Sequence, residues 1–296
     1  MYDVDRGRRF GLVFLLLAIT LGRGSASAQQ VIMAGEWVSR YQEDQPERIP
    51  GPALGDYLGL PITDGARLYA LSWDPNRLSV PEHQCRVHTA PYIYRGPMQF
   101  RVWEDKDPVT QAVTAIRHYI STYEQNRTIW MDGRPHPPEY ALHYWAGVST
   151  GTWTGDMLTV TTTHIKQNWH RRNGLPQSDR AELTEHFILH GDVLTRISFT
   201  TDPVYLTEPL VKSENFVRQE RSEGNWLWPC DVVEESARPK TEVPHYLPGQ
   251  NPYLAEIANK YGLPVEVTMG GAEQMYPEYR ATLKALLAKS RAAAAQ

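Results

Sequence analysis

Residues 181–201 alternate between two sets of side chains on either side of a Gly-Asp turn. In the second arm, Val193, Thr195, Ile197 and Phe199 fall on one face, and Leu194, Arg196, Ser198 and Thr200 fall on the other. A period of two residues is typical of a half-buried strand. Gly191 and Asp192 suit the turn of a hairpin. The sequence therefore predicts two antiparallel strands, 181–189 and 193–201.

A second hairpin is indicated by residues 147–153 and 157–163 on either side of Thr154-Gly155-Asp156. Leu158, Val160 and Thr162 alternate with Thr159, Thr161 and Thr163. So many β-branched side chains disfavour a helix, because helix formation restricts their side-chain rotation.

Four further strands are expected, at residues 99–103, 116–123, 127–131 and 210–217. An antiparallel meander of about eight strands must either close on itself or expose its edges. We therefore predict an all-β fold whose core, residues 99–230, is a closed barrel; a sandwich is the alternative. Residues 29–98, rich in Pro and Gly, should wrap this core as irregular chain, and residues 231–296 should form an extension with helices at 252–261 and 277–295.

The amino-terminal segment has the pattern of an export signal. Arg6, Arg8 and Arg9 precede an apolar run at residues 10–21, and Ala26-Ser27-Ala28 follows it. This order predicts cleavage before Gln29. The run is too short to span a bilayer, so we expect no stable membrane insertion after cleavage and a periplasmic or secreted protein. Either the general or the twin-arginine route fits these residues.

Charge and cysteine content narrow the possible partners. A net charge of −4 and a sequence pI near 6.2 argue against nucleic acid. Cys85 and Cys230 are expected to form a disulfide in an oxidising compartment, although His83, Cys85 and His88 together could also bind a metal. No glycine-rich phosphate loop is present, and we expect neither a cofactor nor a metal site.

Several separated motifs resemble those of a known group of proteins. They are Asp132-Gly133-Arg134-Pro135-His136-Pro137, the run from Gly151 to Val160, Leu183 to Phe187, and Asp202-Pro203. Over about residues 85–230 the chain resembles a large group of uncharacterised secreted bacterial proteins, a likeness that implies no activity. The Gly-x-Trp element and the up-and-down strands look like lipocalins and their relatives, whose barrels hold one small apolar ligand.

The stretch 164–179, between the two hairpins, carries the densest set of chemically active side chains. A long loop between antiparallel strands commonly covers one mouth of a barrel. His164 or His170, oriented by Asp179 or Glu185, could transfer a proton. Arg171 or Arg172 could hold a carboxylate or a developing oxyanion. The alternative is a solvated loop with weak surface ion pairs.

Aromatic side chains are the candidates for a ligand-binding wall. Tyr144, Trp145, Trp153 and Trp169 could line a cavity, or they could fill a small barrel. Arg134 could bind a ligand, or it could stabilise the turn that Asp132 and Gly133 begin.

Three hypotheses follow. The first is an exported barrel that binds a small, mostly apolar molecule. The second is a cofactor-independent isomerase, lyase or hydrolase that uses a His/carboxylate pair at the mouth of the barrel. The third is an envelope protein with a Trp-rich interaction surface. The sequence does not define an oligomeric state.

Overall fold

The computed structural model describes residues 33–48, 51–74, 81–96, 99–220 and 229–294, except 235, 236, 238, 242–245 and 248. The expected export signal, residues 1–28, lies outside the described residues. Residues 33–296 form one compact unit.

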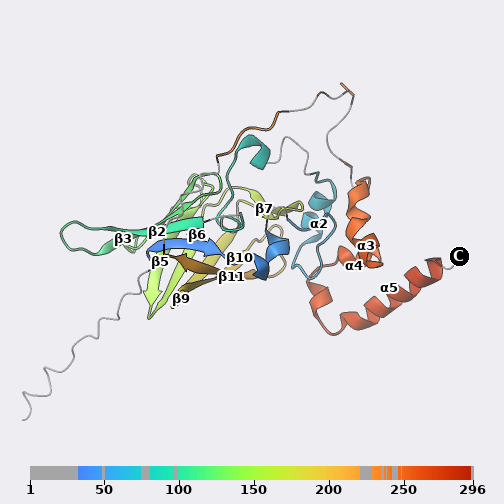
Figure 1. The fold of residues 1–296 in the computed structure, drawn as a ribbon. Helices are drawn as coiled ribbons and strands as arrows, with labels where there is room; N and C mark the ends of the chain where they lie inside the picture. Colours follow the sequence, from blue (N-terminus) through green and yellow to red (C-terminus); the bar gives the residue numbers. More distant parts are fainter. Residues whose placement is uncertain are drawn as a thin grey trace, which may run out of the picture. The chain divides into compact units, whose positions relative to one another are not determined.

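Nine strands close into a barrel in the order β1-β11-β10-β9-β6-β5-β4-β3-β2 (Figure 1). The strands are β1 (Gly35–Ser39), β2 (Gln99–Lys106), β3 (Val113–Ile120), β4 (Gln125–Trp130), β5 (Val148–Thr154), β6 (Met157–Thr163), β9 (Glu182–His190), β10 (Val193–Thr201) and β11 (Leu210–Gln219). The predicted all-β barrel is confirmed. Neighbouring strands are antiparallel except β4 and β5, which pair in parallel. Both predicted hairpins are present, as β5–β6 and β9–β10.

Strand β1 closes the barrel and differs from the expected irregular wrap. It pairs with β11 through Glu36 and Gln219, and with β2 through Trp37 and Phe100. The same amino-terminal region also forms α2 (Asp64–Leu71) and the short 3-10 helices η1 (Tyr41–Glu43), η2 (Gln45–Glu47) and η3 (Pro81–Gln84). Helix α2 begins after Thr63, whose hydroxyl accepts a hydrogen bond from the amide of Ala66.

The interior of the barrel is filled with side chains. On β10 the buried face is the one that carries Leu194 and Arg196, while Phe199 is exposed. Tyr94, from the irregular segment before β2, enters the interior. Its ring lies 5.4 Å from that of Phe100 and 6.3 Å from that of Phe187, centroid to centroid. Aromatic edge contacts of this kind make a close-packed core.

A chain of charged side chains crosses the same interior. Glu185 on β9 pairs with Arg127 on β4 and with Arg196 on β10, and Arg196 in turn pairs with Glu214 on β11. All four side chains are fully buried. Buried charges are tolerated when each has a close partner of opposite sign.

The chain between β6 and β9 forms a separate hairpin, β7 (Asn168–Arg171) and β8 (Leu175–Gln177).

After β11, the described carboxyl-terminal elements are η4 (Pro252–Ala255), α3 (Glu256–Tyr261), α4 (Val265–Thr268), η5 (Ala272–Met275) and α5 (Tyr279–Ala294). Both predicted helical regions are therefore present. The amide of Tyr57 donates to the carbonyl of Thr268 at 2.8 Å, so this region packs on the segment before α2.

No helix in the described part of the chain has the length and apolar character needed to cross a membrane.

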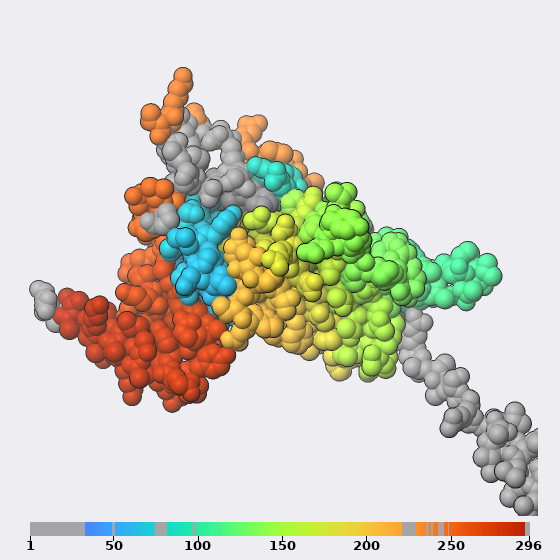
Figure 2. Space-filling model, turned by 180° about the vertical axis from the view of Figure 1, so that it is seen from behind, coloured from blue at the N-terminus to red at the C-terminus, as the bar shows by residue number. Residues whose placement is uncertain are grey.

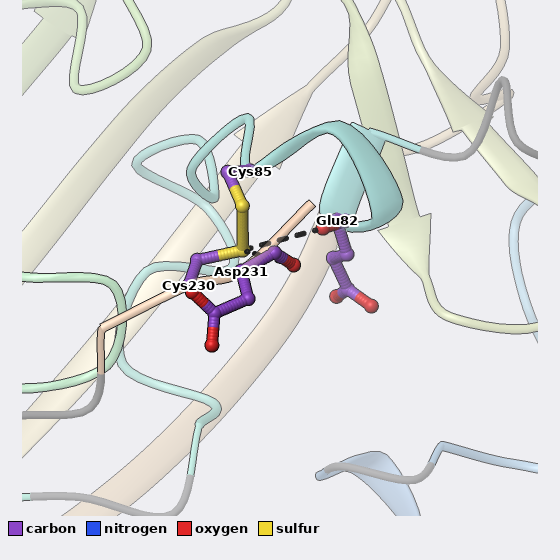
Figure 3. The surroundings of a disulfide bond; sticks show 4 residues. All are labelled: Glu82, Cys85, Cys230 and Asp231. Carbon is purple, nitrogen blue, oxygen red and sulfur yellow. Dashed lines mark hydrogen bonds between the residues drawn. A yellow bond between two sulfur atoms is a disulfide. The ribbon is translucent and has the colours of Figure 1, made fainter. Parts of the chain in front are cut away.

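Cys85 and Cys230 form the predicted disulfide, which joins residues 145 apart in the sequence (Figure 3). Cys85 directly follows η3, and the amide of Val233 donates to the carbonyl of His83 at 3.0 Å. The bond therefore ties the chain after β11 to the segment that leads into the barrel.

Candidate functional site: a groove with three histidines

A groove of about 990 Å³ lies outside the packed interior, between the segment that leads from β4 to β5 and the segments that flank β9 and β10. Its charged and titratable lining comprises the imidazoles of His136, His143 and His164, the carboxylates of Glu139, Asp179, Glu182, Asp202 and Glu208, and Arg180. Three threonines, Thr163, Thr201 and Thr207, also line it. Its apolar lining comprises Pro137, Ala181, Pro203, Leu206 and Pro209. In Figure 2 the green surface around residue 140 adjoins the yellow surface around residue 180.

The protonation of two groove histidines follows from their hydrogen bonds. Nε2 of His164 lies 2.9 Å from the carbonyl oxygen of Pro138, which can only accept, so Nε2 carries the hydrogen. A neutral His164 then accepts at Nδ1 from the Thr163 hydroxyl, 2.8 Å away. Since that hydroxyl has used its hydrogen, Nδ1 of His136 must donate to the Thr163 oxygen, also at 2.8 Å. Nε2 of His136 then accepts from Thr150 at 2.9 Å.

His143 is the third imidazole and has a free nitrogen. Its Nδ1 donates to the carbonyl of Ile165 at 3.0 Å, so a neutral ring presents Nε2 as an acceptor. Within the described residues Nε2 has no hydrogen-bond partner, and His143 lines the groove beside His164, with 5.3 Å between ring centroids. His143 is therefore the imidazole best able to bind a ligand or to take a proton from it.

Asp202 forms one wall of the groove. Its carboxylate accepts from the amide of Ser178 at 2.8 Å, from the Ser178 hydroxyl at 2.7 Å and from the amide of Val204 at 3.0 Å. It also pairs with Nε2 of His170 at 3.1 Å. Burial raises the pKa of this carboxyl group, but these hydrogen bonds outweigh burial and lower the pKa to about 2.

The structure brings two of the four predicted proton-transfer residues, His164 and Asp179, to the groove. His170 is buried and bonds to Asp202 instead of Asp179 or Glu185. Burial lowers the pKa of His170, partly offset by Asp202. Glu185 lies inside the barrel between two arginines, away from the groove lining.

The predicted ligand-binding aromatics and arginines lie apart from one another. Trp169 packs on Trp73, with 6.4 Å between ring centroids, and Trp153 packs against the barrel core. Trp145 lies under Lys166, whose Nζ is 4.8 Å from the ring centroid. Tyr144 is 52% exposed.

The two predicted arginines are held by protein groups. Arg171 pairs with Glu47 and donates to the carbonyl of Asp56 at 2.8 Å. Arg134 pairs with Asp132 and stacks on Trp130, 3.6 Å from the ring centroid. None of the six residues predicted to bind a ligand lines the groove.

His143 was not predicted from the sequence. His136 and Asp202 were noted there only as parts of motifs. The available signal was weak, because His136 lies in the Asp-Gly-Arg-Pro-His-Pro turn and Asp202 follows a strand end. Their partners Thr150, Thr163 and His170 are 14 to 32 residues away in the sequence, and spacing alone does not identify such pairs.

Among the described residues no three His, Cys, Asp or Glu side chains are grouped as metal ligands.

Comparison of the chain with protein-family models, with curated proteins and with solved structures gives no match, so function is inferred from the groove itself.

Proposed function

We propose that this protein is an exported binding protein and that its groove takes a small molecule with an apolar body and a positively charged group. The observation that carries the proposal is the groove lining, in which prolines and Leu206 lie beside five carboxylates and a single arginine. A volume of about 990 Å³ is in the range of small-molecule sites.

The groove suits a ligand better than the barrel interior does. Aromatic rings and paired charges occupy the interior, and a ligand there would have to displace well-packed side chains. We therefore propose that the ligand binds in the groove outside the barrel, and not inside a lipocalin-like barrel as the sequence suggested. The disulfide fits the proposed export, because disulfides persist in oxidising compartments.

The sign of the ligand charge follows from the free carboxylates. Asp202 is held by Ser178 and His170, and Glu208 accepts from the hydroxyl of Tyr276 at 3.0 Å. The side chains of Asp179 and Glu182 have no partner within the described residues and are exposed at the edge of the groove. They favour an ammonium or guanidinium group over a carboxylate.

A ligand screen tests the proposal. The purified protein would be mixed with matched pairs of small molecules that share an apolar body and carry either an amine or a carboxylate, and binding would be followed by thermal shift and native mass spectrometry. We expect the amines to bind, and the double variant Asp179→Asn/Glu182→Gln to weaken their binding about three- to tenfold, because exposed charges contribute up to about 1 kcal/mol each. Asp156→Asn, in the exposed β5–β6 turn, is the control and should bind normally. Equal binding of amines and carboxylates would contradict the proposed ligand class.

A second candidate function is proton transfer, favoured by the free Nε2 of His143. Hydrogen bonding of Nδ1 to a carbonyl fixes the tautomer of a catalytic imidazole in the same way. If a bound ligand is turned over, His143→Ala should abolish turnover while binding persists, and His186→Ala, on strand β9 outside the groove lining, should leave turnover unchanged. Turnover that survives in His143→Ala would exclude this role.

A further inference from the structure

The segment 135–143, here called the rim, borders the groove and is attached to the protein through histidines. Four hydrogen bonds join the rim to the rest of the described residues, and each has an imidazole nitrogen at one end. No side chain of the rim is buried, and Tyr140 is 90% exposed. Little apolar burial therefore holds the rim in place, and local opening is governed by these hydrogen bonds.

We infer that the rim is an acid-sensitive gate, closed over the groove while His136 is neutral and released when His136 is protonated. This inference rests on the proposed function for its purpose, the release of a bound molecule, but the opening of the rim is a property of the free protein.

The hydrogen-bond chain explains why protonation opens the rim. In the closed state the Thr163 oxygen accepts from His136 and its hydroxyl donates to His164. Protonation of His136 puts a hydrogen on Nε2, which can then no longer accept from the Thr150 hydroxyl 2.9 Å away. The nearby His164 also disfavours a positive charge on this ring.

The backbone at His164 supports a rim that can change state. His164 has φ of 54°, a conformation that is unfavourable for residues other than glycine. Its carbonyl accepts from the amide of Tyr144 at 2.9 Å, while its ring holds Pro138. Tyr144 directly follows the rim, so His164 is held in this conformation by one hydrogen bond within the rim and one at its end.

The surroundings of His136 set the direction of the pH effect. Partial burial lowers the pKa of His136, the nearby His164 lowers it further, and Glu182 on β9 opposes both. The other charged and titratable groups of the groove are His143 and Glu139 of the rim, Asp179 and Arg180 before β9, and Asp202 and Glu208 after β10. A lowered histidine pKa means that the closed state prefers the neutral ring. Closure is therefore complete above the ordinary pKa of about 6.5 and is lost as pH falls below it.

Hydrogen–deuterium exchange of the ligand-free protein at pH 7.5 and pH 5 tests the inference, with rates corrected for the intrinsic effect of pH. We expect rim peptides to lose protection at pH 5 relative to pH 7.5, because the closed state prefers the neutral ring of His136. Peptides from the β9–β10 hairpin should keep theirs. A rim equally protected at both pH values would overturn the inference.

His136→Gln is the matched variant, because a glutamine amide can donate to Thr163 and accept from Thr150 without titrating. Its rim should stay protected at pH 5 to a greater extent than that of the natural protein. The control is His186→Gln, which replaces a ring bonded to Thr159 outside the groove; it should keep the natural pH response. A natural response in His136→Gln would also overturn the inference. If His136→Gln does not fold, Thr163→Val, which removes the hydroxyl that links the two rings, should expose the rim at pH 7.5, and unchanged protection there would count against the gate.

The two proposals can fail separately. An acid-opened rim in a protein that binds no amine would leave the gate standing and the proposed ligand wrong. Amine binding of equal affinity at pH 7.5 and pH 5, with a rim protected at both, would leave the ligand standing and the gate wrong.

Discussion

Glu185 and Arg127 form an ion pair whose side chains are both inaccessible to solvent, in the middle of the barrel. Arg127 reaches Glu185 from β4 across the interior, and its guanidinium also donates to the Thr162 hydroxyl at 2.9 Å and to the Tyr94 hydroxyl at 3.0 Å. The ion pair thereby connects β4, β6 and β9 with the segment that plugs the barrel. Such a pair constrains which side chains can face inward, because any strand shifted by one residue would leave a buried charge alone.

Removing one partner should therefore be costly. We expect Arg127→Met to lower the free energy of unfolding by about 3 to 5 kcal/mol, because the charge of Glu185 is then only partly compensated by Arg196. Urea unfolding followed by tryptophan fluorescence measures the change. Arg117→Met, which breaks the partly exposed pair with Asp105, is the control and should cost less than about 1 kcal/mol. Equal losses in the two variants would show that the buried ion pair contributes no more to the free energy of unfolding than the partly exposed pair does.

Acid should unfold the protein through the same buried carboxylates. Burial raises the pKa of Glu185, but Arg127 and Arg196 outweigh burial and lower it from 4.5 to about 2. A lowered carboxyl pKa contributes stability above the unfolded-state value, and this stability is lost as pH falls from about 4.5 toward 2. Free energies of unfolding measured from pH 7 to pH 2 should decline through this window. Glu185→Gln, or Asp202→Asn if the first variant does not fold, should show a shallower decline, and a slope equal to that of the natural protein would contradict this origin.

The hairpins could be predicted from the sequence because their information is local. The alternation in residues 157–163 and 193–201 is complete within each strand, and Gly155 and Gly191 adopt the positive φ values, 62° and 59°, that their turns require. Strand β1 could not be predicted in this way. It is five residues long, and its partners, β2 and β11, lie far away in the sequence.

The groove was harder to predict than the fold because periodicity separates two faces of a strand without saying which one is inside. On β10 the more apolar set of side chains, with Ile197 and Phe199, faces outward. Arg196 faces the core, where it pairs with Glu185 and Glu214. Histidines were recognised as candidates from their chemistry. Their true partners, Thr163 for His136 and Asp202 for His170, are set by strand pairing and loop packing, which the sequence does not display.

The disulfide should stabilise the protein mainly by lowering the conformational entropy of the unfolded chain. Cys85 and Cys230 are 145 residues apart, and the chain-entropy model gives roughly 4 to 5 kcal/mol for a loop of this size. The double variant Cys85→Ser/Cys230→Ser should lose stability of this order in urea unfolding. A reducing agent should destabilise the natural protein and leave the double variant unchanged. A double variant as stable as the natural protein would mean that the loop is already constrained without the bond.

Asp202 should both stabilise the protein and hold the groove in its shape. Its carboxylate accepts hydrogen bonds from the amides of Val204 and Tyr205 and from both polar groups of Ser178, so it fixes the two chain segments on either side of the groove wall. In Asp202→Asn, an amide NH2 group replaces one acceptor oxygen and faces donors, leaving buried N–H or O–H groups unpaired. We expect a loss of about 3 kcal/mol, since hydrogen bonds to a charged group contribute about 1.5 to 3 kcal/mol each and asparagine keeps some of them. Hydrogen exchange should become faster at residues 178–182 and 202–207 before it does so in the barrel strands. Asp156→Asn, in an exposed turn, should change neither quantity. If Asp202→Asn lowered stability while exchange at both segments stayed natural, Asp202 would support the fold without shaping the groove.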